Sequence, residues 1–271
     1  MHVVRHATDL APFRGGILVP TMGALHAGHA ALIKQASSHE SAREGVVVSI
    51  FVNPAQFNDP RDFEKYPKTW DADLALCEQC GATCIFAPEV GDIYPPGVLQ
   101  APLILPNVAR GKGLEDHYRP GHFDGVYRVV KRLFDLVQPR TAVFGEKDWQ
   151  QLQLVRAMVT RERFGIDIIG APTVRETDGL AASSRNKLLS AEARERALGL
   201  SRAIEAARPC HNVAHAERAA WRLMVAHGVS PEYAAVRDGA TLGPVQSRDT
   251  ARVLVAGMVA GTRLIDNGTW A

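Results

Sequence analysis

No stretch of this 271-residue sequence is long and apolar enough to cross a membrane. The longest apolar runs, at residues 17–20 and 46–52, fall far short of the roughly 20 residues that a spanning helix needs. A secretory signal is not expected either, because His2, Arg5 and His6 interrupt the N-terminal residues. We therefore expect a cytoplasmic protein with no membrane partner.

The sequence also has little excess of charge of either sign and few cysteines. The net charge is only +2 and the basic residues are scattered, whereas nucleic-acid binding needs a dense cationic face, so no nucleic-acid partner is expected. Three of the four cysteines, Cys77, Cys80 and Cys84, are close in sequence, which raises a metal site or a redox pair. A zinc site would need a fourth ligand nearby, while Cys77 continues a helical apolar pattern and Cys84 begins an apolar strand. We expect buried thiols and no protein-bound metal.

The hydrophobic pattern predicts an α/β fold. The chain is 46% hydrophobic and 22% charged, as is typical of globular proteins. Uniformly apolar segments alternate with helical patterns, which predicts a Rossmann-like, doubly wound parallel sheet with helices on both faces. The expected strands are residues 15–21, 45–53, 83–88, 141–145 and 166–170, and the expected helices are residues 29–39, 70–79, 125–137 and 149–161.

After Pro172 the pattern changes, which predicts a smaller α+β lid domain. The boundary is expected at residues 173–174, which divides the chain into domains 1–173 and 174–271. The expected elements of the second domain are helices at 191–207 and 213–227 and strands at 232–238, 251–259 and 262–267.

The sharpest motif is PTMGALHAGH, at residues 20–29, between an expected strand and an expected helix. Ligands of open α/β sheets bind at the carboxyl ends of strands, and a helix N-terminus attracts phosphate. Gly23 and Gly28 would let a nucleotide approach the backbone. His26 and His29 share one helix face, so both could reach phosphate oxygens and gain a proton near neutral pH. The alternatives are a zinc site and histidines without a chemical role.

Two other segments suit phosphate. In GEKDWQQ, at residues 145–151, Lys147 can direct its charge at phosphate, Gly145 leaves room, and Asp148 can cap the next helix. A solvated lysine is the alternative. SSRN, at residues 183–186, offers two hydroxyls and the Arg185 guanidinium, a set suited to binding triphosphate; the alternative is an ordinary helix-capping turn.

Together these segments resemble the pantothenate synthetase family of the HIGH-signature nucleotidyltransferases. The resemblance runs from near Gly16 to near Asn267 and includes residues 51–67, 121–134, 144–156, 174–190 and 263–267. It implies a ligase that uses ATP with Mg²⁺ to join pantoate to β-alanine through a pantoyl adenylate, and it implies a homodimer. An enzyme that adenylylates a phosphate and an inactive nucleotide-binding module remain alternatives.

The resemblance also implies site residues. The catalytic set would be His26, His29, Lys147 and Arg185, with His29 protonating the leaving oxygen. Gln56 and Gln151, which the sequence alone would leave on the surface, would bind pantoate together with Met22, and Gln56 would also bind β-alanine. The implied ATP-binding residues are Met22, Gly23, Ala24, Leu25, His26, Ala27, Gly28, His29, Gly145, Glu146, Lys147, Asp148, Val174, Ala182, Ser183, Ser184 and Arg185.

Two positions depart from the family pattern. Ala182 stands where Met is usual, which puts an adenine contact in doubt, and Arg128 replaces a small polar residue near the expected pantoate pocket. His117 and His122 could be ligands, but a role in ordering the structure is favoured.

Overall fold

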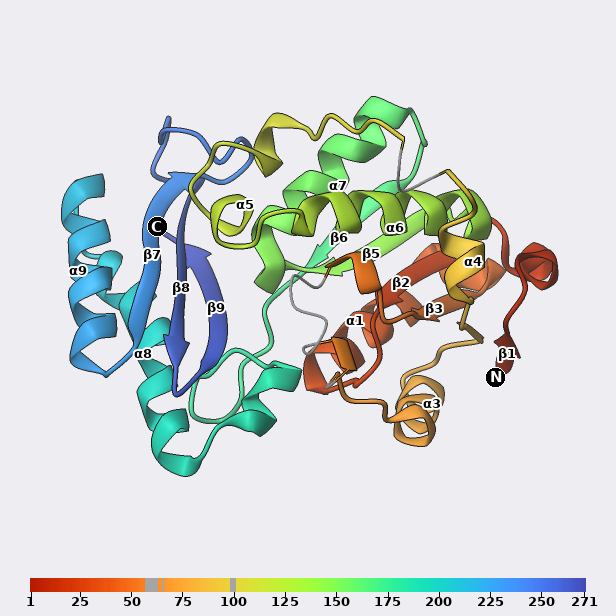
Figure 1. The fold of residues 1–271 in the computed structure, drawn as a ribbon, viewed down its shortest axis with the longest axis horizontal. Coiled ribbons are helices and arrows are strands. Elements are labelled where there is room, and N and C mark those ends of the chain that lie inside the picture. Colours follow the sequence, from red (N-terminus) through yellow and green to blue (C-terminus); the bar gives the residue numbers. More distant parts are fainter. Residues whose placement is uncertain (57–62, 65, 98–100) are drawn as a thin grey trace.

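A computed structural model describes residues 1–56, 63–64, 66–97 and 101–271 (Figure 1). Residues 57–62 and 65, which belong to the segment 51–67 named above, lie outside the described residues. Most of the chain before Pro172 surrounds one sheet, and the rest forms a second sheet with two helices beside it (Figure 1).

The first sheet has six parallel strands in the order β1-β4-β3-β2-β5-β6. The order reverses between β2 and β5, and ligands of such sheets bind at that point, outside the carboxyl ends of the strands. This confirms the predicted Rossmann-like fold. The strands are β1 (His2–Val4), β2 (Ile17–Thr21), β3 (Val46–Ile50), β4 (Cys84–Phe86), β5 (Thr141–Gly145) and β6 (Asp167–Ala171). The short edge strand β1 was not predicted.

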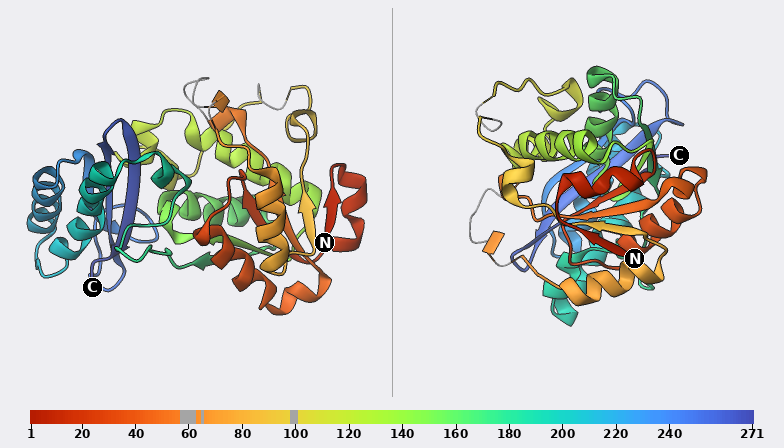
Figure 2. Two further views of the ribbon diagram at one scale, coloured as in Figure 1. Left: turned by 90° about the horizontal axis from the view of Figure 1, so that it is seen from below. Right: turned by 90° about the vertical axis from the view of Figure 1, so that its right-hand side faces the viewer.

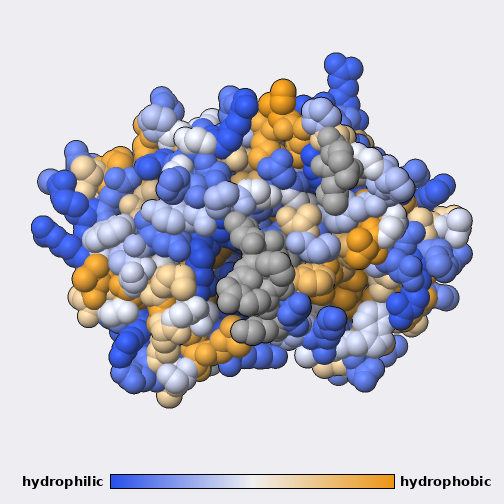
Figure 3. Space-filling model, in the orientation of Figure 1, coloured by the Kyte–Doolittle hydropathy of each residue, from blue (hydrophilic) through white to orange (hydrophobic). Residues whose placement is uncertain are grey.

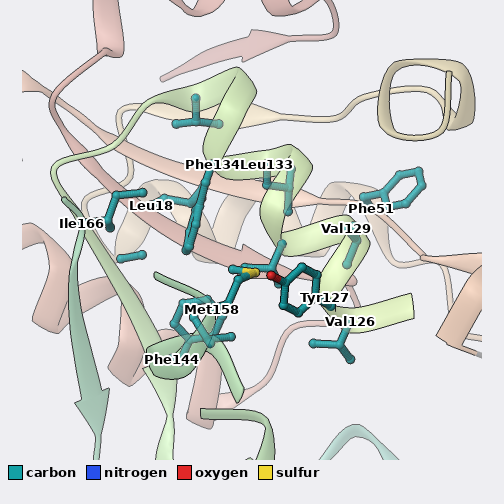
Figure 4. Close-up of a cluster of buried hydrophobic side chains, with 14 of the residues drawn as sticks. Leu18, Phe51, Val126, Tyr127, Val129, Leu133, Phe134, Phe144, Met158 and Ile166 are labelled. Atoms are coloured by element: carbon teal, nitrogen blue, oxygen red, sulfur yellow. The ribbon is translucent and has the colours of Figure 1, made fainter. Parts of the chain in front are cut away.

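Helices cover both faces of this sheet (Figure 2). Against one face pack α1 (Ala27–Ser37) and α3 (Trp70–Gln79), which bury Ile33 and Cys77. Against the other pack α6 (His122–Val137) and α7 (Trp149–Glu162), whose Phe134 and Met158 lie beside Phe144 of β5 (Figure 4). Full burial of each such side chain contributes about 1.5–3 kcal/mol to folding, so the two layers fix the strand ends in place.

The cysteines lie where the pattern predicted, Cys77 in α3 and Cys84 at the start of β4. Burial raises the pKa of each of these two thiols to about 12, so both remain protonated at neutral pH. Gly81, with a φ of 91°, follows the end of α3.

The second sheet is antiparallel, in the order β7-β8-β9, and comprises β7 (Ser230–Asp238), β8 (Ala251–Val259) and β9 (Thr262–Thr269). Its side chains alternate between two environments. Val253 and Val255 pack against α8 (Ala191–Ala207) and α9 (Val213–Ala226), whereas Tyr233 and Leu254 pack with Leu114 of the first part of the chain. The sheet therefore lies between its own helices and the larger domain.

Short elements complete the fold. They are α4 (Val90–Ile93), α5 (Glu115–Tyr118) and the 3-10 helices η1 (Ala7–Phe13), η2 (Glu40–Glu44), η3 (Pro54–Gln56), η4 (Asn107–Ala109), η5 (Glu146–Asp148) and η6 (Ser184–Leu188). Hydrophobic residues on the face in Figure 3 form patches among hydrophilic ones. Within the described ranges, no helix combines the length and apolarity that crossing a membrane requires.

Candidate active site

A cavity of about 260 Å³ opens at the carboxyl ends of β2, β3, β5 and β6. It brings together residues from all the segments of the family resemblance except 263–267, although these segments are far apart in the chain. The predicted site residues in its wall are Met22, His26, Gly28, His29, Gln56, Gly145, Lys147, Asp148, Gln151, Val174, Ala182, Ser183, Ser184 and Arg185.

The other predicted ATP-binding residues do not line this cavity. Gly23, Ala24 and Leu25 are buried, Ala27 is exposed, and Glu146 pairs with Arg252 at 2.8 Å.

A buried carboxylate, which the sequence did not indicate, holds the loop between β2 and α1. Asp73 of α3 accepts hydrogen bonds from the backbone N–H of Ala24 at 2.9 Å and of Leu25 at 2.8 Å. It also accepts one from the Thr69 hydroxyl at 2.9 Å. These bonds hold Ala24 at a φ of 52°, a left-handed conformation that non-glycine residues seldom adopt. The loop therefore enters α1 in a fixed path.

The two histidines cap α1 with their own ring nitrogens. His26 Nδ1 accepts from the Gly28 N–H at 3.1 Å, and His29 Nδ1 accepts from the His26 N–H at 3.3 Å. An accepting Nδ1 leaves the proton of a neutral imidazole on Nε2. Gly28 is required here, because a Cβ would lie 2.8 Å from the His26 ring. The two capping hydrogen bonds thus place the ring proton of each neutral histidine on Nε2, where it can be donated.

The pKa values of both histidines lie below the ordinary imidazole range. Burial, then the positive charge of Lys147, lowers the pKa of His26 to about 4. Burial, then His26, lowers the pKa of His29 to about 3. Both rings are neutral at pH 7 and can act as hydrogen-bond donors without carrying charge. The role of His29 in protonating the leaving oxygen stays a prediction.

Lys147 lies in η5, between β5 and α7, and lines the cavity. The predicted helix cap by Asp148 is wrong: its side chain makes no capping hydrogen bond to α7 and is exposed in the cavity wall. Asp148 is the one carboxylate among the described lining residues. With Arg119, Lys147 and Arg185 against this single carboxylate, the charged side chains of the described lining are predominantly cationic.

The segment after β6 closes another side of the cavity. The Ala182 N–H donates to the Val174 carbonyl at 2.9 Å, which places these two expected adenine neighbours side by side. Ser183 caps η6 by accepting from the Arg185 N–H at 3.2 Å, so the capping alternative holds for this serine. Ser184 and Arg185 nevertheless line the cavity.

The far wall is apolar, with amides at its edge. Val126, Val129, Val130 and Leu133 of α6 line it, and Gln56 and Gln151 lie at the same cavity. The backbone of η3 approaches α6 so closely that a Cβ on Gly125 would lie 2.4 Å from the Ala55 carbonyl. This contact fixes the short helix that carries Gln56.

Among the lining residues that the sequence did not predict are Asn53, Tyr66 and Arg119. Asn53 donates to the Gly125 carbonyl at 3.1 Å and accepts from the Tyr94 hydroxyl at 2.6 Å. Its place directly after an apolar strand, three residues before Gln56, was a signal that could have identified it.

The remaining candidates have separate outcomes. His122 begins α6, is buried and lines the cavity, with its Nε2 3.1 Å from Arg119 Nη1. Burial, then Arg119, lowers its pKa to about 3. His117 is exposed, packs on Tyr118 and does not line the cavity. Arg128 does not line the cavity, and its guanidinium donates to the Ala101 carbonyl at 2.7 Å.

Comparisons with known proteins agree on one family. A family model described as pantoate-beta-alanine ligase matches residues 5–269. A pantothenate synthetase of Nocardioides sp. is 48% identical, over 92% of this chain and 77% of the relative. One of Bacteroides thetaiotaomicron is 46% identical, over 92% of this chain and 89% of the relative.

Solved structures agree as well. Pantothenate synthetase from Thermus thermophilus superimposes with a TM-score of 0.90 at 42% identity, over 100% of this chain and 99% of that one. Pantoate-beta-alanine ligase from Francisella tularensis, complexed with Beta-gamma ATP and Beta-alanine, gives a TM-score of 0.82 at 32% identity, over 100% and 98%.

Proposed function

The chain belongs to the pantoate–β-alanine ligase family, and we propose that the cavity described above carries out the family's reaction through a pantoyl adenylate. The protein is an ATP-dependent ligase that condenses pantoate with β-alanine to form pantothenate. The observation that supports the proposed route most strongly is a single cavity lined by hydrogen-bond donors and cations, by apolar side chains of α6 and by the amides of Gln56 and Gln151.

The proposed reaction has two steps. A carboxylate oxygen of pantoate attacks the α-phosphorus of ATP, and pyrophosphate leaves. The amine of β-alanine then attacks the acyl carbon, the amide forms, AMP leaves with the bridging oxygen, and the amine loses a proton. Two lower barriers replace one high barrier, and no covalent bond to the protein is needed.

The donors and cations of the lining suit the first step. The Nε2–H groups of His26 and His29 and the charges of Lys147 and Arg185 would stabilise negative charge on the α- and β-phosphates. Since both imidazoles are neutral before ATP binds, they contribute oriented donors, and the two cationic side chains contribute the charge. Val174 and Ala182 would lie along the adenine.

The apolar side chains and amides of the lining suit pantoate. Its two methyl groups match the wall formed by Val126, Val129 and Val130, and its two hydroxyls and carboxylate match the amides of Gln56 and Gln151. Met22 would lie between pantoate and the nucleotide, and Gln56 would also face β-alanine. A phosphorylated acceptor would place its charge against the same apolar wall, which disfavours the phosphate-adenylylating alternative.

Magnesium would arrive with ATP. Among the described lining residues a single carboxylate, Asp148, could approach the ion, and Mg²⁺ commonly combines one or two carboxylates with substrate phosphates. The residues therefore fit a triphosphate-bound ion next to Asp148. When bound, Mg²⁺ would neutralise triphosphate charge.

Pyrophosphate exchange tests the adenylate step. Labelled pyrophosphate is incubated with the purified protein, ATP, Mg²⁺ and pantoate, without β-alanine. We expect label to enter ATP only when pantoate is present. An absence of exchange with every carboxylate offered, despite ATP binding, would leave the inactive module as the better description.

We also propose domains at 1–173 and 174–271 with the second acting as a lid, and a cytoplasmic location, both from the sequence pattern, and a homodimer from the family resemblance. A lid over the cavity would protect an acyl adenylate from water. Light scattering after size-exclusion chromatography tests the dimer by its mass.

A further inference from the structure

The segment at residues 263–267 is part of the family resemblance, yet it contributes no side chain to the large cavity. It lies on β9, in the sheet of the smaller domain. Three of its side chains nevertheless reach segments that carry cavity residues: Arg263, Asp266 and Asn267.

Asn267 has the most specific contacts of the three. It is 3% exposed, and its Nδ2 donates to two successive carbonyls, of Glu146 at 3.0 Å and of Lys147 at 2.8 Å. Its Oδ1 accepts from Arg252 Nε at 2.6 Å. The amide orientation is fixed, because the flipped amide would place an oxygen against two carbonyl oxygens and an NH₂ group against a guanidinium.

Arg252 of β8 supports the same loop from both sides of Lys147. Its Nη2 pairs with Glu146 at 2.8 Å, and its guanidinium carbon lies 3.5 Å from the centroid of the Trp149 ring. The Trp149 Nε1–H donates to the Gly239 carbonyl at 2.8 Å, again in the smaller domain. The residues before and after Lys147 are therefore held by the second sheet.

The other two β9 side chains, Arg263 and Asp266, also contact segments that carry cavity residues. Arg263 binds Glu115 through two hydrogen bonds, at 2.6 and 2.8 Å, and Glu115 lies 3.7 Å from the cavity residue Arg119. Asp266 binds Arg175, next to Val174, at 2.7 and 3.0 Å. One strand thus contacts three separate segments of the cavity wall.

We propose that Asn267 is a positioning residue of the ligase, which places Lys147 against the triphosphate by holding the carbonyls of Glu146 and Lys147. The inference rests on the proposed function, because it acts through the role given to Lys147 in the adenylate step. The lysine side chain extends into the cavity from this loop, so a shift of the backbone moves its ammonium group away from the developing charge.

The direct test is Asn267→Asp, which keeps the volume but replaces the donor with an oxygen facing two carbonyls. Pantoate-dependent pyrophosphate exchange is measured over a range of pantoate and ATP concentrations. We expect kcat to fall roughly tenfold to a hundredfold, while KM for each substrate changes less than about threefold. The matched control is Asn212→Ala, which removes the cap of α9 in the same domain and should leave both constants near those of the unchanged protein.

A double-mutant cycle with Lys147→Ala separates positioning from general destabilisation. Single-turnover rates are measured with the protein in excess, so that slow variants can be compared. If Asn267 acts through Lys147, Asn267→Asp should slow the Lys147→Ala protein less than about threefold. The same loss in both backgrounds would overturn the inference.

The remaining outcomes are also decisive. If Asn267→Asp does not fold, Asn267→Ala takes its place with the same expectations. A folded variant with unchanged kcat, or one changed only in KM, would contradict the positioning role. Failure of the unchanged protein to exchange pyrophosphate would instead contradict the proposed adenylate step, so the two failures are distinguishable.

Discussion

Two loops that carry cavity residues are anchored by side chains of opposite hydrogen-bonding character. In the loop before α1, which we call the histidine loop, the Asp73 carboxylate accepts from two successive backbone N–H groups, of Ala24 and Leu25. In the loop before α7, which we call the lysine loop, the Asn267 amide donates to two successive carbonyls, of Glu146 and Lys147. Each anchor therefore fixes two successive backbone groups of a loop that carries cavity residues.

The two anchors also differ in where they come from. Asp73 lies in α3, within the same layered domain as its loop, whereas Asn267 lies in the sheet of the smaller domain. The histidine loop is therefore anchored by a side chain of its own domain. The lysine loop takes its anchor from the second sheet, so the proposed lid would be coupled to Lys147 through Asn267.

The largest effect is expected from removal of the charge on the lysine loop. Lys147→Ala should lower kcat for pyrophosphate exchange on the order of a thousandfold, because a cation in a water-poor site stabilises the transition state strongly. Lys187→Ala, an exposed lysine of η6 outside the cavity lining, is the control and should change kcat by less than about threefold. Similar losses in the two variants would remove the basis for assigning Lys147.

On the histidine loop, His29→Asn separates capping from chemistry. The asparagine Oδ1 can accept from the His26 N–H as Nδ1 does, but nothing replaces the Nε2–H donor. We expect exchange to slow on the order of a hundredfold, with stability within about 1 kcal/mol of the unchanged protein. Urea unfolding and exchange assays on one preparation measure both; full activity would show that the Nε2–H group is dispensable.

The anchor of the histidine loop should contribute mainly to stability. Asp73→Asn turns one acceptor into a donor facing a backbone N–H, which should cost about 2–3 kcal/mol in the free energy of unfolding. Asp71→Asn, an exposed change in the same helical turn, should stay within about 0.5 kcal/mol. Equal destabilisation by the two substitutions would contradict the anchoring role.

A fall in pH should lower the free energy of unfolding through His29 of the histidine loop. His29 has a pKa of about 3 in the folded protein, below the ordinary value of 6.5, so the unfolded chain binds the proton first as the pH falls. Between pH 7 and pH 5 this costs about 2 kcal/mol of stability. His29→Asn should flatten the dependence of urea midpoints on pH by that amount, whereas Lys147→Ala should keep it; equal slopes in all three proteins would contradict the assignment.

The sequence predicted the sheet and the residues at its edge better than the side chains that anchor the two loops. Apolar strands and their order along the chain indicated the sheet, and the rule that ligands bind at strand ends brought His26, His29 and Lys147 to one edge. Asp73 and Asn267 could not be found this way. Their partners are backbone groups 49 and 121 residues away, and backbone groups have no signature in a sequence.

The low pKa values of the histidines could not be predicted from the sequence for a related reason. Residue spacing indicated that His26 and His29 share a helix face, but not that both rings are buried beside the Lys147 charge. The same limit applies to Arg128, since position in a helix near the pocket does not say which face a side chain occupies.

The most direct test of the central claim follows an oxygen atom. Pantoate labelled with oxygen-18 in its carboxylate is incubated with the protein, ATP, Mg²⁺ and β-alanine, and the products are examined by mass spectrometry. A pantoyl adenylate transfers one labelled oxygen to AMP, so the account predicts labelled AMP in an amount equal to the pantothenate formed. Label in inorganic phosphate or pyrophosphate, or unlabelled AMP beside newly formed pantothenate, would contradict it.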